Sequence, residues 1–396
     1  MKEWKTYKLE DLLSIPVRNG LTKPSAIRGK GVKMIGMGEL FANETIRDIE
    51  MPRVPVTDSE LKLSAIEKGD LLFARQSLTL EGAGKCSLVR EVTEPTVFES
   101  HIIRCRVNKN LVLPEYLYYY FKSRLGRHKI ECIVEQVAAA GIRGKDLIRI
   151  EIPIPDMHTQ RSIVDCLSTL DEKIHYNSLI NDNLEQQAQA AFNNIVANTT
   201  SDKTIQLSEI AWLNPKRSIS KGKVARSIEM AYLPTTGSFP SGWDMKEYNG
   251  GMKFQNGDTL MARITPCLEN GKVAFVNFLE DDEIAFGSTE YITMTPKRQF
   301  APEVLYFLVR NAEFVDFAVK NMNGSSGRQR VSADTIGTYE LPDITQEELH
   351  MLETIAREAL TKIKYNSLEN MRLADMRDAL LPKLMSGELK INETDC

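Results

Sequence analysis

The chain contains the stretch KIHYNSLIN at residues 173–181, and nearly the same stretch, KIKYNSLEN, returns at residues 362–370. Other stretches recur at a spacing close to 188 residues: GDLLFAR at 69–75 returns as GDTLMAR at 257–263, and PEYLY at 114–118 returns as PEVLY at 302–306. Chance does not keep one spacing across a whole half-chain, so the pattern indicates an internal repeat. Two copies are too few for a solenoid, and the repeat therefore predicts a molecule with pseudo-twofold symmetry.

Each copy consists of a module rich in Gly, Pro, aromatic residues and short β-type runs, followed by a segment rich in helix formers. The predicted parts are a first module at 1–156, a first helix at 157–198, a second module at 199–344, a second helix at 345–388 and a tail at 389–396. The predicted fold class is α/β (mixed α+β), with two globular modules joined by two long helices that form an antiparallel coiled coil.

The two helices share the alternating spacing of four and three residues that is typical of a coiled-coil seam. The predicted seam residues are Ile163, Leu167, Leu170, Ile174, Asn177, Asn181, Leu184, Leu352, Ile363, Asn366, Asn370, Leu373, Leu380 and Leu384. One such helix alone would more simply be an amphipathic helix packed on a domain, but two copies, each following a module, favour a helix pair. If the helices run in opposite directions, Asn177 faces Asn370 and Asn181 faces Asn366, which fixes the register at a cost in stability.

The charge of the chain is unevenly distributed. There are 50 Lys and Arg residues against 54 Asp and Glu residues, a net charge of −4, which taken alone disfavours a nucleic-acid binder. Split at the predicted boundaries, the net charge is +4 for the first module, −3 for the first helix, −2 for the second module and −3 for the remainder. The acidity therefore lies mainly in the helices, and the modules are nearly neutral with local basic runs.

Composition limits the class of protein further. With 396 residues, of which 42% are hydrophobic, the chain is long enough for two or three packed domains and is not mainly disordered. No apolar run reaches the roughly 18 residues that a membrane span needs, and the charged start lacks the apolar stretch of a signal peptide. These features predict a cytoplasmic protein without a membrane partner. The six scattered Cys residues predict reduced thiols rather than a zinc site.

Basic runs occur at the same place in both modules. A single run of charge is usually a solvated surface, but its recurrence in turn-prone, Gly-containing loops favours contacts with DNA phosphates. The candidate residues are Lys23, Arg28, Lys30 and Lys33 in the first module, and Lys216, Arg217, Lys221, Lys223 and Arg226 in the second.

Late in each module, a Gly-containing loop carries guanidinium or amide side chains that suit base edges in a DNA groove. The candidates are Arg143 and Lys145 in AGIRGKD at 140–146, and Arg328, Gln329 and Arg330 in SGRQRVS at 326–332. For one such loop, a surface loop paired with nearby carboxylates is an equal alternative. Arg75 and Arg263, just after a shared strand, are either further DNA contacts or ion-pair partners of Asp70 and Asp258. The repetition of the carboxylate slightly favours the ion pair.

The sequence lacks the common catalytic patterns. The stretch GAGKC at 82–86 lacks the first Gly and the metal-binding Ser or Thr of a phosphate-binding loop, which argues against nucleotide binding. There is no HExxH or GxSxG, and the five His residues show no metal-ligand spacing. A metal-dependent nuclease would need a carboxylate–Lys cluster, and the acidic run EDDE at 280–283 has no Lys at that spacing. The sequence predicts a binding protein with no catalytic or metal site.

Three further patterns carry a family resemblance. They are GSSGRQRVS at 324–332 with Leu341-Pro342 behind it, IPIP at 152–155, and the helix entry QRSI at 160–163. With these patterns, the chain resembles the specificity (S) subunit of type I restriction–modification systems over essentially its full length. The first module departs from the family pattern, because it has AAAGIR at 138–143 in place of GxxGRQ.

The resemblance implies a non-catalytic subunit in which each module is a target recognition domain that reads one half of a bipartite, asymmetric sequence in double-stranded DNA. It also implies that the two conserved helices set the spacer and dock two methyltransferase (M) subunits, to which restriction (R) subunits add. S-adenosylmethionine, ATP and Mg are then expected in the partner subunits, and no cofactor in this chain. A coiled-coil assembly scaffold without DNA readout is the alternative.

Overall fold

The structure, a computed structural model, describes residues 4–136, 140–199, 203–297, 300–325 and 327–389. Two predictions fall partly outside these ranges, at Ser326 in the late loop of the second module and in the tail after Leu389. The chain forms two compact units, one of Met1–Glu172 with Ala374–Cys396 and one of Lys173–Leu373. Each unit therefore contains one module together with a part of each long helix. The boundaries between the units lie within the two long helices and not between a module and its helix.

The first module is built around a five-stranded sheet with the strand order β2-β10-β6-β8-β4. Two three-stranded sheets, β5-β3-β9 and β11-β12-β7, and the pair β1-β13 complete it. Its elements are β1 (Lys5–Lys8), η1 (Leu9–Leu12), β2 (Leu13–Asn19), η2 (Ser25–Ile27), β3 (Val32–Ile35), α1 (Met37–Ala42), β4 (Thr45–Ile46), β5 (Arg53–Val54), α2 (Asp58–Ser64), β6 (Leu71–Ala74), β7 (Gln76–Ser77), β8 (Cys86–Val89), β9 (Thr96–Phe98), β10 (Ile102–Val107), α3 (Pro114–Lys122), α4 (Arg124–Glu131), β11 (Glu135–Gln136), β12 (Ala140–Gly141), α5 (Gly144–Leu147) and β13 (Glu151–Ile154). The central strand β6 is buried at every residue, which accounts for its uninterrupted apolar sequence.

The second module repeats this arrangement with the sheets β15-β22-β19-β20 and β17-β16-β21-β18 and the pair β14-β23. Its elements are β14 (Thr204–Gln206), α7 (Leu207–Ile210), β15 (Ala211–Leu213), β16 (Val224–Ile228), β17 (Asp244–Glu247), β18 (Met252–Phe254), β19 (Thr259–Ala262), β20 (Val273–Phe275), β21 (Ala285–Gly287), β22 (Tyr291–Pro296), α8 (Pro302–Arg310), α9 (Ala312–Lys320), α10 (Ala333–Gly337) and β23 (Glu340–Pro342). The parallel pair β3–β9 of the first module returns here as β16–β21. The common strand order confirms the internal repeat and the mixed α/β fold class.

Two local signals start the same elements in both modules. Gly69 and Gly257 have φ angles of 98° and 88°, which glycine adopts at little cost, and they turn the chain into β6 and β19. Pro114 and Pro302 stand in the first turn of α3 and α8, where the missing N–H has no helical partner to lose.

The core of each module continues onto the long helices α6 and α11. In the first unit, the buried aromatic residues of α3 belong to one cluster with Ile163 and Leu167 of α6 and Leu384 of α11. In the second unit, the buried residues of α8 cluster with Ala188 of α6 and Leu352 of α11. The helices are therefore part of both hydrophobic cores, and neither core is complete without them.

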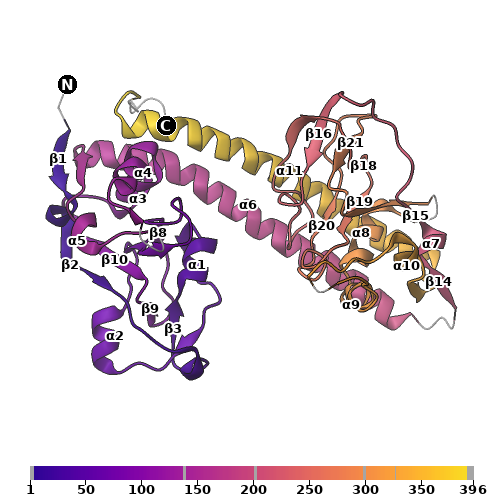
Figure 1. Ribbon diagram of the computed structural model, residues 1–396, viewed down its shortest axis with the longest axis horizontal. Helices are drawn as coiled ribbons and strands as arrows, with labels where there is room; N and C mark the ends of the chain where they lie inside the picture. The colour runs from indigo at the N-terminus through magenta and orange to yellow at the C-terminus, as the bar shows by residue number, and fades with distance from the viewer. Residues whose placement is uncertain (1–3, 137–139, 200–202, 298–299, 326, 390–396) are drawn as a thin grey trace. The chain divides into compact units, whose positions relative to one another are not determined.

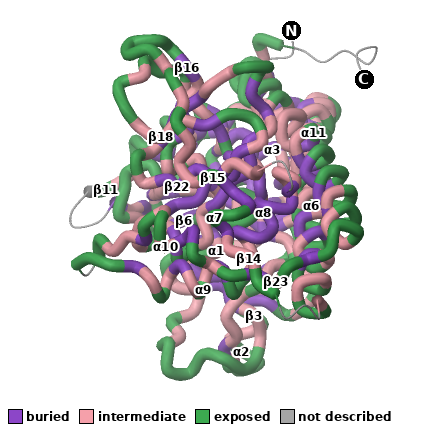
Figure 2. The backbone as a smooth tube through the Cα atoms, turned by 90° about the vertical axis from the view of Figure 1, so that its right-hand side faces the viewer, coloured by how far each residue is buried: buried purple, intermediate pink, exposed green. Residues whose placement is uncertain are grey.

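The helix α6 spans Met157–Asn198, the same residues as the predicted first helix, and α11 spans Gln346–Met385, inside the predicted second segment (Figure 1). Pro382 lies in the last turn of α11, which continues past it to Met385. Buried and exposed segments alternate along both helices, as Figure 2 shows. Within the described ranges, no helix is both long and apolar enough to cross a membrane.

All the predicted seam residues are buried or partly buried. In the second unit, the Asn177 side chain donates from Nδ2 to Asn370 Oδ1 at 2.9 Å, and Asn366 Nδ2 donates to Asn181 Oδ1 at 2.9 Å. These are the two pairs expected for antiparallel helices, because the residue number rises on one helix as it falls on the other. Asn177 and Asn366 are only 2% and 3% exposed, so these amides are core groups that need a partner.

We expect Asn181→Leu to destabilise the second unit, because it leaves the buried Asn366 amide without its acceptor. An unsatisfied buried polar group costs about 1–3 kcal/mol of unfolding free energy. The double variant Asn181→Leu/Asn366→Leu removes both amides and should be more stable than the single variant, as measured by urea unfolding of the full chain. A double variant less stable than the single variant would show that the loss of stability does not come from an unsatisfied Asn366 amide.

Candidate nucleic-acid interface

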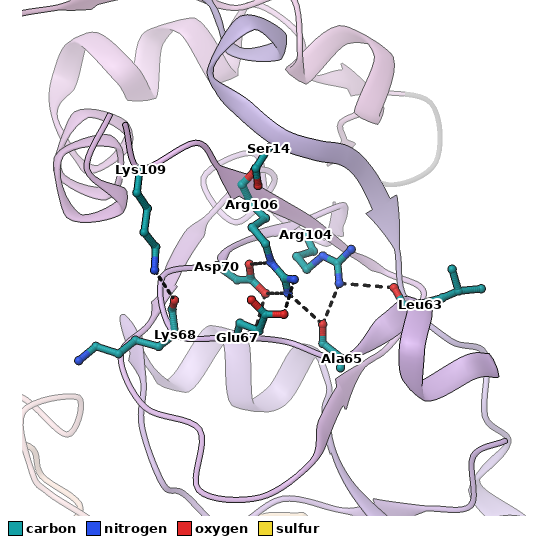
Figure 3. Close-up of polar contacts among 9 residues, drawn as sticks. All are labelled: Ser14, Leu63, Ala65, Glu67, Lys68, Asp70, Arg104, Arg106 and Lys109. Carbon is teal, nitrogen blue, oxygen red and sulfur yellow. Dashed lines mark hydrogen bonds and ion pairs between the residues drawn. The ribbon is translucent and has the colours of Figure 1, made fainter. Parts of the chain in front are cut away.

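A buried carboxylate of the first module is neutralised by an arginine of a neighbouring strand. Asp70 is fully buried directly before β6. Its Oδ2 accepts a hydrogen bond from the Glu67 backbone N–H at 2.8 Å, and Arg106 of β10 donates to Oδ1 at 2.7 Å and to Oδ2 at 2.8 Å (Figure 3). The hydrogen bond to Asp70 raises the pKa of Arg106, whereas burial lowers the pKa of the neighbouring Arg104. The buried Arg104 guanidinium donates a hydrogen bond to the Ala65 carbonyl at 2.8 Å, which replaces a hydrogen bond to water that burial removes.

The second module has the same carboxylate but takes its cation from elsewhere. Asp258, also fully buried, accepts from the Gln255 N–H at 2.8 Å, from Thr295 Oγ1 at 2.6 Å and from Arg217 Nη2 at 2.8 Å. The pairing of β10 with β6 and of β22 with β19 places Arg106 and Thr295 at equivalent positions. Because threonine carries no charge, Arg217, which precedes β16, supplies the positive charge.

These networks bear on two predictions. Arg217 is a predicted DNA contact, and the structure places its side chain, only 7% exposed, in an ion pair with Asp258. Arg75 and Arg263 were favoured as partners of Asp70 and Asp258, but those partners are Arg106 and Arg217.

Other candidate cations are held by surface carboxylates. In the first module, Lys23 pairs with Glu60, Lys33 with Asp48 and Glu94, and Arg143 with Glu135. In the second module, Arg226 pairs with Glu280 and Glu283, and both Arg263 and Arg330 pair with Glu290. The alternative of a loop paired with nearby carboxylates therefore describes Arg143 and Arg330 in this structure.

The remaining candidate cations have no such partner within the described residues. Arg28, Lys30, Lys145, Lys216, Lys221, Lys223 and Arg328 are exposed, and Arg75 and Gln329 are partly buried. Among the residues that the structure describes, Arg28, Lys30, Arg75, Lys145, Lys216, Lys221, Lys223 and Arg328 form no ion pair, and the Gln329 side chain forms no hydrogen bond.

The early loops of the two modules present these cations in the same way. Lys30 lies between Gly29 and Gly31, whose φ angles are 120° and 105°, directly before β3. In the second module, Lys221 and Lys223 flank Gly222, with a φ of 80°, directly before β16, the strand equivalent to β3. Left-handed glycines therefore shape both loops, and both loops project lysines at the beginning of equivalent strands.

The late loops lie beside the segments that follow β6 and β19. In the first module, β12 pairs with β7, and the Ile142 N–H donates to the Arg75 carbonyl at 2.9 Å. In the second module, the Thr265 N–H donates to the Gln329 carbonyl at 3.0 Å. The structure thus brings Arg75 to the loop of Arg143, and Arg263 to the loop of Arg328. Arg330 is fixed by Glu290, so Arg328 is the exposed arginine of that turn.

Three exposed residues are not among the candidates that the sequence predicts. Leu78, directly after β7, is 98% exposed, and Tyr176 and Tyr365 of the repeated helix stretch are 56% and 63% exposed. The sequence could have indicated the two tyrosines, because they recur at the same place in both copies but lie off the seam. It could not have indicated Leu78, because a single apolar residue in a loop forms no periodic pattern. Among the described residues, no group of three or more His, Cys, Asp and Glu could hold a metal ion.

We expect Arg217→Ala to destabilise the second module, because Asp258 is left buried without its cation. Removing one partner of a buried ion pair costs about 3–5 kcal/mol of unfolding free energy. Burial raises the pKa of Asp258, and Arg217 opposes that rise, so the pKa rises further in the variant. A carboxyl group whose pKa is higher in the folded than in the unfolded protein contributes to folding stability while it is protonated. That contribution to stability is lost as the pH rises through the folded-state pKa. The penalty should therefore be larger near pH 7 than near pH 5 by urea unfolding.

The matched control is the same substitution in an Asp258→Asn background. The neutral amide has no charge to compensate there, so the cost of removing Arg217 should be smaller and should not change over this pH range. An equal cost in both backgrounds would mean that Arg217 acts through packing rather than through its charge.

Comparisons with known proteins agree with this architecture. Residues 1–186 match the family described as the type I restriction modification DNA specificity domain. The specificity subunit of type I restriction enzyme HindI from Haemophilus influenzae is 22% identical over 98% of this chain and 100% of its own length. That of MjaIX from Methanocaldococcus jannaschii is 23% identical over 99% of this chain and 95% of its own.

The fold has a counterpart among solved structures. The type I restriction–modification S subunit from M. genitalium superposes with a TM-score of 0.58 at 16% sequence identity, covering 96% of each chain. This likeness concerns the fold alone. Together, the domain match over residues 1–186, the two alignments over nearly the full chain and this likeness of fold show that the chain is similar to specificity subunits of type I restriction–modification systems.

Proposed function

We propose that this chain is the DNA-reading and assembly subunit of its restriction–modification complex, and that each module reads one half of a bipartite, asymmetric target in double-stranded DNA. One observation carries the proposal. Although the chain is acidic overall, both modules have exposed lysines in equivalent loops, before β3 and before β16, that form no ion pair among the residues the structure describes. Exposed cations in glycine-shaped loops suit phosphate contacts.

The cations divide by position into two roles. Arg28, Lys30, Lys216, Lys221 and Lys223 of the early loops contact phosphates and place each module on the duplex. The late loops reach base edges, where Arg328 suits guanine and Gln329 suits adenine through paired hydrogen bonds. In the late loop of the first module, Arg143 pairs with Glu135, whereas the exposed Lys145 forms no ion pair within the described part of the chain. The two modules therefore read different sequences.

The helix pair is the docking site for the methyltransferase subunits. Tyr176 and Tyr365 recur in the repeated helix stretch, and both are more than half exposed. Two copies of one surface suit two copies of one partner, and exposed tyrosines are frequent anchors of protein interfaces. The chain itself is non-catalytic in this proposal. S-adenosylmethionine, ATP and Mg act in the methyltransferase and restriction subunits.

The first test compares Arg328→Ala with Lys221→Ala in the assembled methyltransferase complex. Genome-wide mapping of the methylated motif, with and without this chain, supplies the DNA probe. For Arg328→Ala we expect binding to weaken by about 1–3 kcal/mol at one or two base pairs of one half-site only. For Lys221→Ala we expect binding to weaken by a similar amount for every DNA sequence. We also expect the salt dependence of the binding constant to fall by the equivalent of about one released counter-ion.

A motif that persists when the chain is deleted would contradict the proposal and favour a scaffold without DNA readout. A uniform loss for Arg328→Ala would assign that residue to a phosphate instead.

The second test addresses the docking surface with Tyr176→Ala and Tyr365→Ala. We expect each variant to weaken the binding of one methyltransferase subunit by about 2 kcal/mol, the size typical of an interface anchor. Native mass spectrometry should then show complexes that retain a single methyltransferase, with the melting temperature of the chain unchanged. The control is Met376→Ala, which removes a residue that is 52% exposed on α11 outside the repeated stretch. Full assembly in both tyrosine variants would place the docking surface elsewhere.

A further inference from the structure

Leu78 stands out among the exposed apolar residues of the first module. It is 98% exposed, whereas Tyr365, the next most exposed large apolar residue in the described part of the chain, is 63% exposed. Scattered single apolar residues on a surface are common, so exposure alone assigns no role. The surroundings of Leu78 supply the argument.

The turn that carries Leu78 is well ordered by its own contacts. The Thr79 N–H donates to Ser77 Oγ at 3.1 Å, and the Gly82 N–H donates to Thr79 Oγ1 at 3.2 Å. Arg127 of α4 donates to the carbonyls of Leu80 and Ala83, both at 2.9 Å. A Cβ at Gly82 would lie 2.1 Å from Ser77 Oγ, so the turn is also closely packed. The fold therefore holds Leu78 in the solvent in a fixed position, at a cost in hydrophobic free energy.

The turn lies beside the candidate base-reading loop. Ser77 pairs with Ala140 and Gln76 with Gly141, so β7 runs next to the strand that leads to Arg143 and Lys145. Lys85, which follows the turn, donates to the Phe41 carbonyl at 2.5 Å, and its ammonium lies 5.8 Å from the Phe41 ring centre.

The charges around the turn suit a nucleic acid better than an apolar protein surface. The turn contains one carboxylate, the exposed Glu81, and Arg143 is neutralised by Glu135. The cations Arg75, Lys85 and Lys145 are not neutralised by an ion pair in the described structure. An apolar tip among cations complements a duplex, whose phosphates border grooves that present thymine methyl groups and base edges.

The second module has a counterpart at the same place. Pro266 occupies the position equivalent to Leu78 in the repeat, is exposed, and follows Thr265, which bonds to the late loop of that module. An exposed apolar residue beside the late loop is thus common to both modules, although the residue types differ.

We infer that Leu78 is a specificity-determining residue that enters a groove of the first half-site and contacts one or two base pairs there. The inference rests on the proposed DNA-reading function. It adds to that function an apolar contact beside the charged and amide residues of the two loops.

The test compares Leu78→Ser with the matched control Leu63→Ser in the assembled methyltransferase complex. Leu63 is 48% exposed on α2 of the same module. The probes are duplexes with the mapped methylated motif, duplexes with each base pair of the first half-site changed in turn, and duplexes in which deoxyuridine replaces each thymine. We expect Leu78→Ser to lower affinity for the motif roughly 10-fold and to reduce discrimination at one or two base pairs, with Leu63→Ser unchanged.

The outcomes separate this inference from the proposed function. If deoxyuridine at one position weakens wild-type binding but not Leu78→Ser binding, the contact is with a thymine methyl group. Unaltered motif affinity and discrimination in Leu78→Ser, with sequence-specific wild-type binding, would overturn the inference alone. A uniform loss on all sequences, or a loss of methyltransferase assembly without a change in base preference, would also overturn it. Wild-type binding without sequence preference would refute the proposed function, and the inference with it.

Discussion

A buried carboxylate at the start of the central strand constrains each module. Asp70 and Asp258 are both fully buried, and a buried charge must be compensated by a partner charge and by hydrogen bonds. Each therefore binds one arginine and one backbone N–H, which joins the turn before β6 or β19 to a second part of the module. In each module, one arginine is therefore bound to the core carboxylate and does not act as an exposed surface cation.

The long helices and the modules meet different demands. The helix pair keeps the same asparagines in both copies, because a buried amide needs a partner amide at a matching height. The modules keep the carboxylate but change the cation that neutralises it, from Arg106 on β10 to Arg217 before β16. The copies thus agree in the asparagine pairs of the helices and differ in the arginine that neutralises the buried carboxylate of each module.

The sequence predicts well what is periodic or repeated. The bounds of α6, the pairing of Asn177 with Asn370 and the two-module organisation follow from spacing alone, because spacing records which residues share a face. The partners of Asp70 and Asp258 could not be predicted. Comparing the copies draws attention to residues that match, such as Arg75 and Arg263, whereas the true partners occupy positions where the residue types differ. Ion pairs of surface cations depend on distances between loops, which no periodic pattern records.

The position of Arg217 has a consequence for how the second module can change in evolution. Its early loop bears exposed lysines, and the same loop supplies the arginine that neutralises the buried Asp258. Substitutions in this loop therefore have to leave Arg217 in place, because Arg217 is the ion-pair partner of Asp258 in the described structure. In the first module the counter-ion comes from β10, and its early loop can drift without that restriction. A change in the early loop of the second module can therefore disturb the buried core, whereas a change in the early loop of the first module leaves the Asp70–Arg106 ion pair in place.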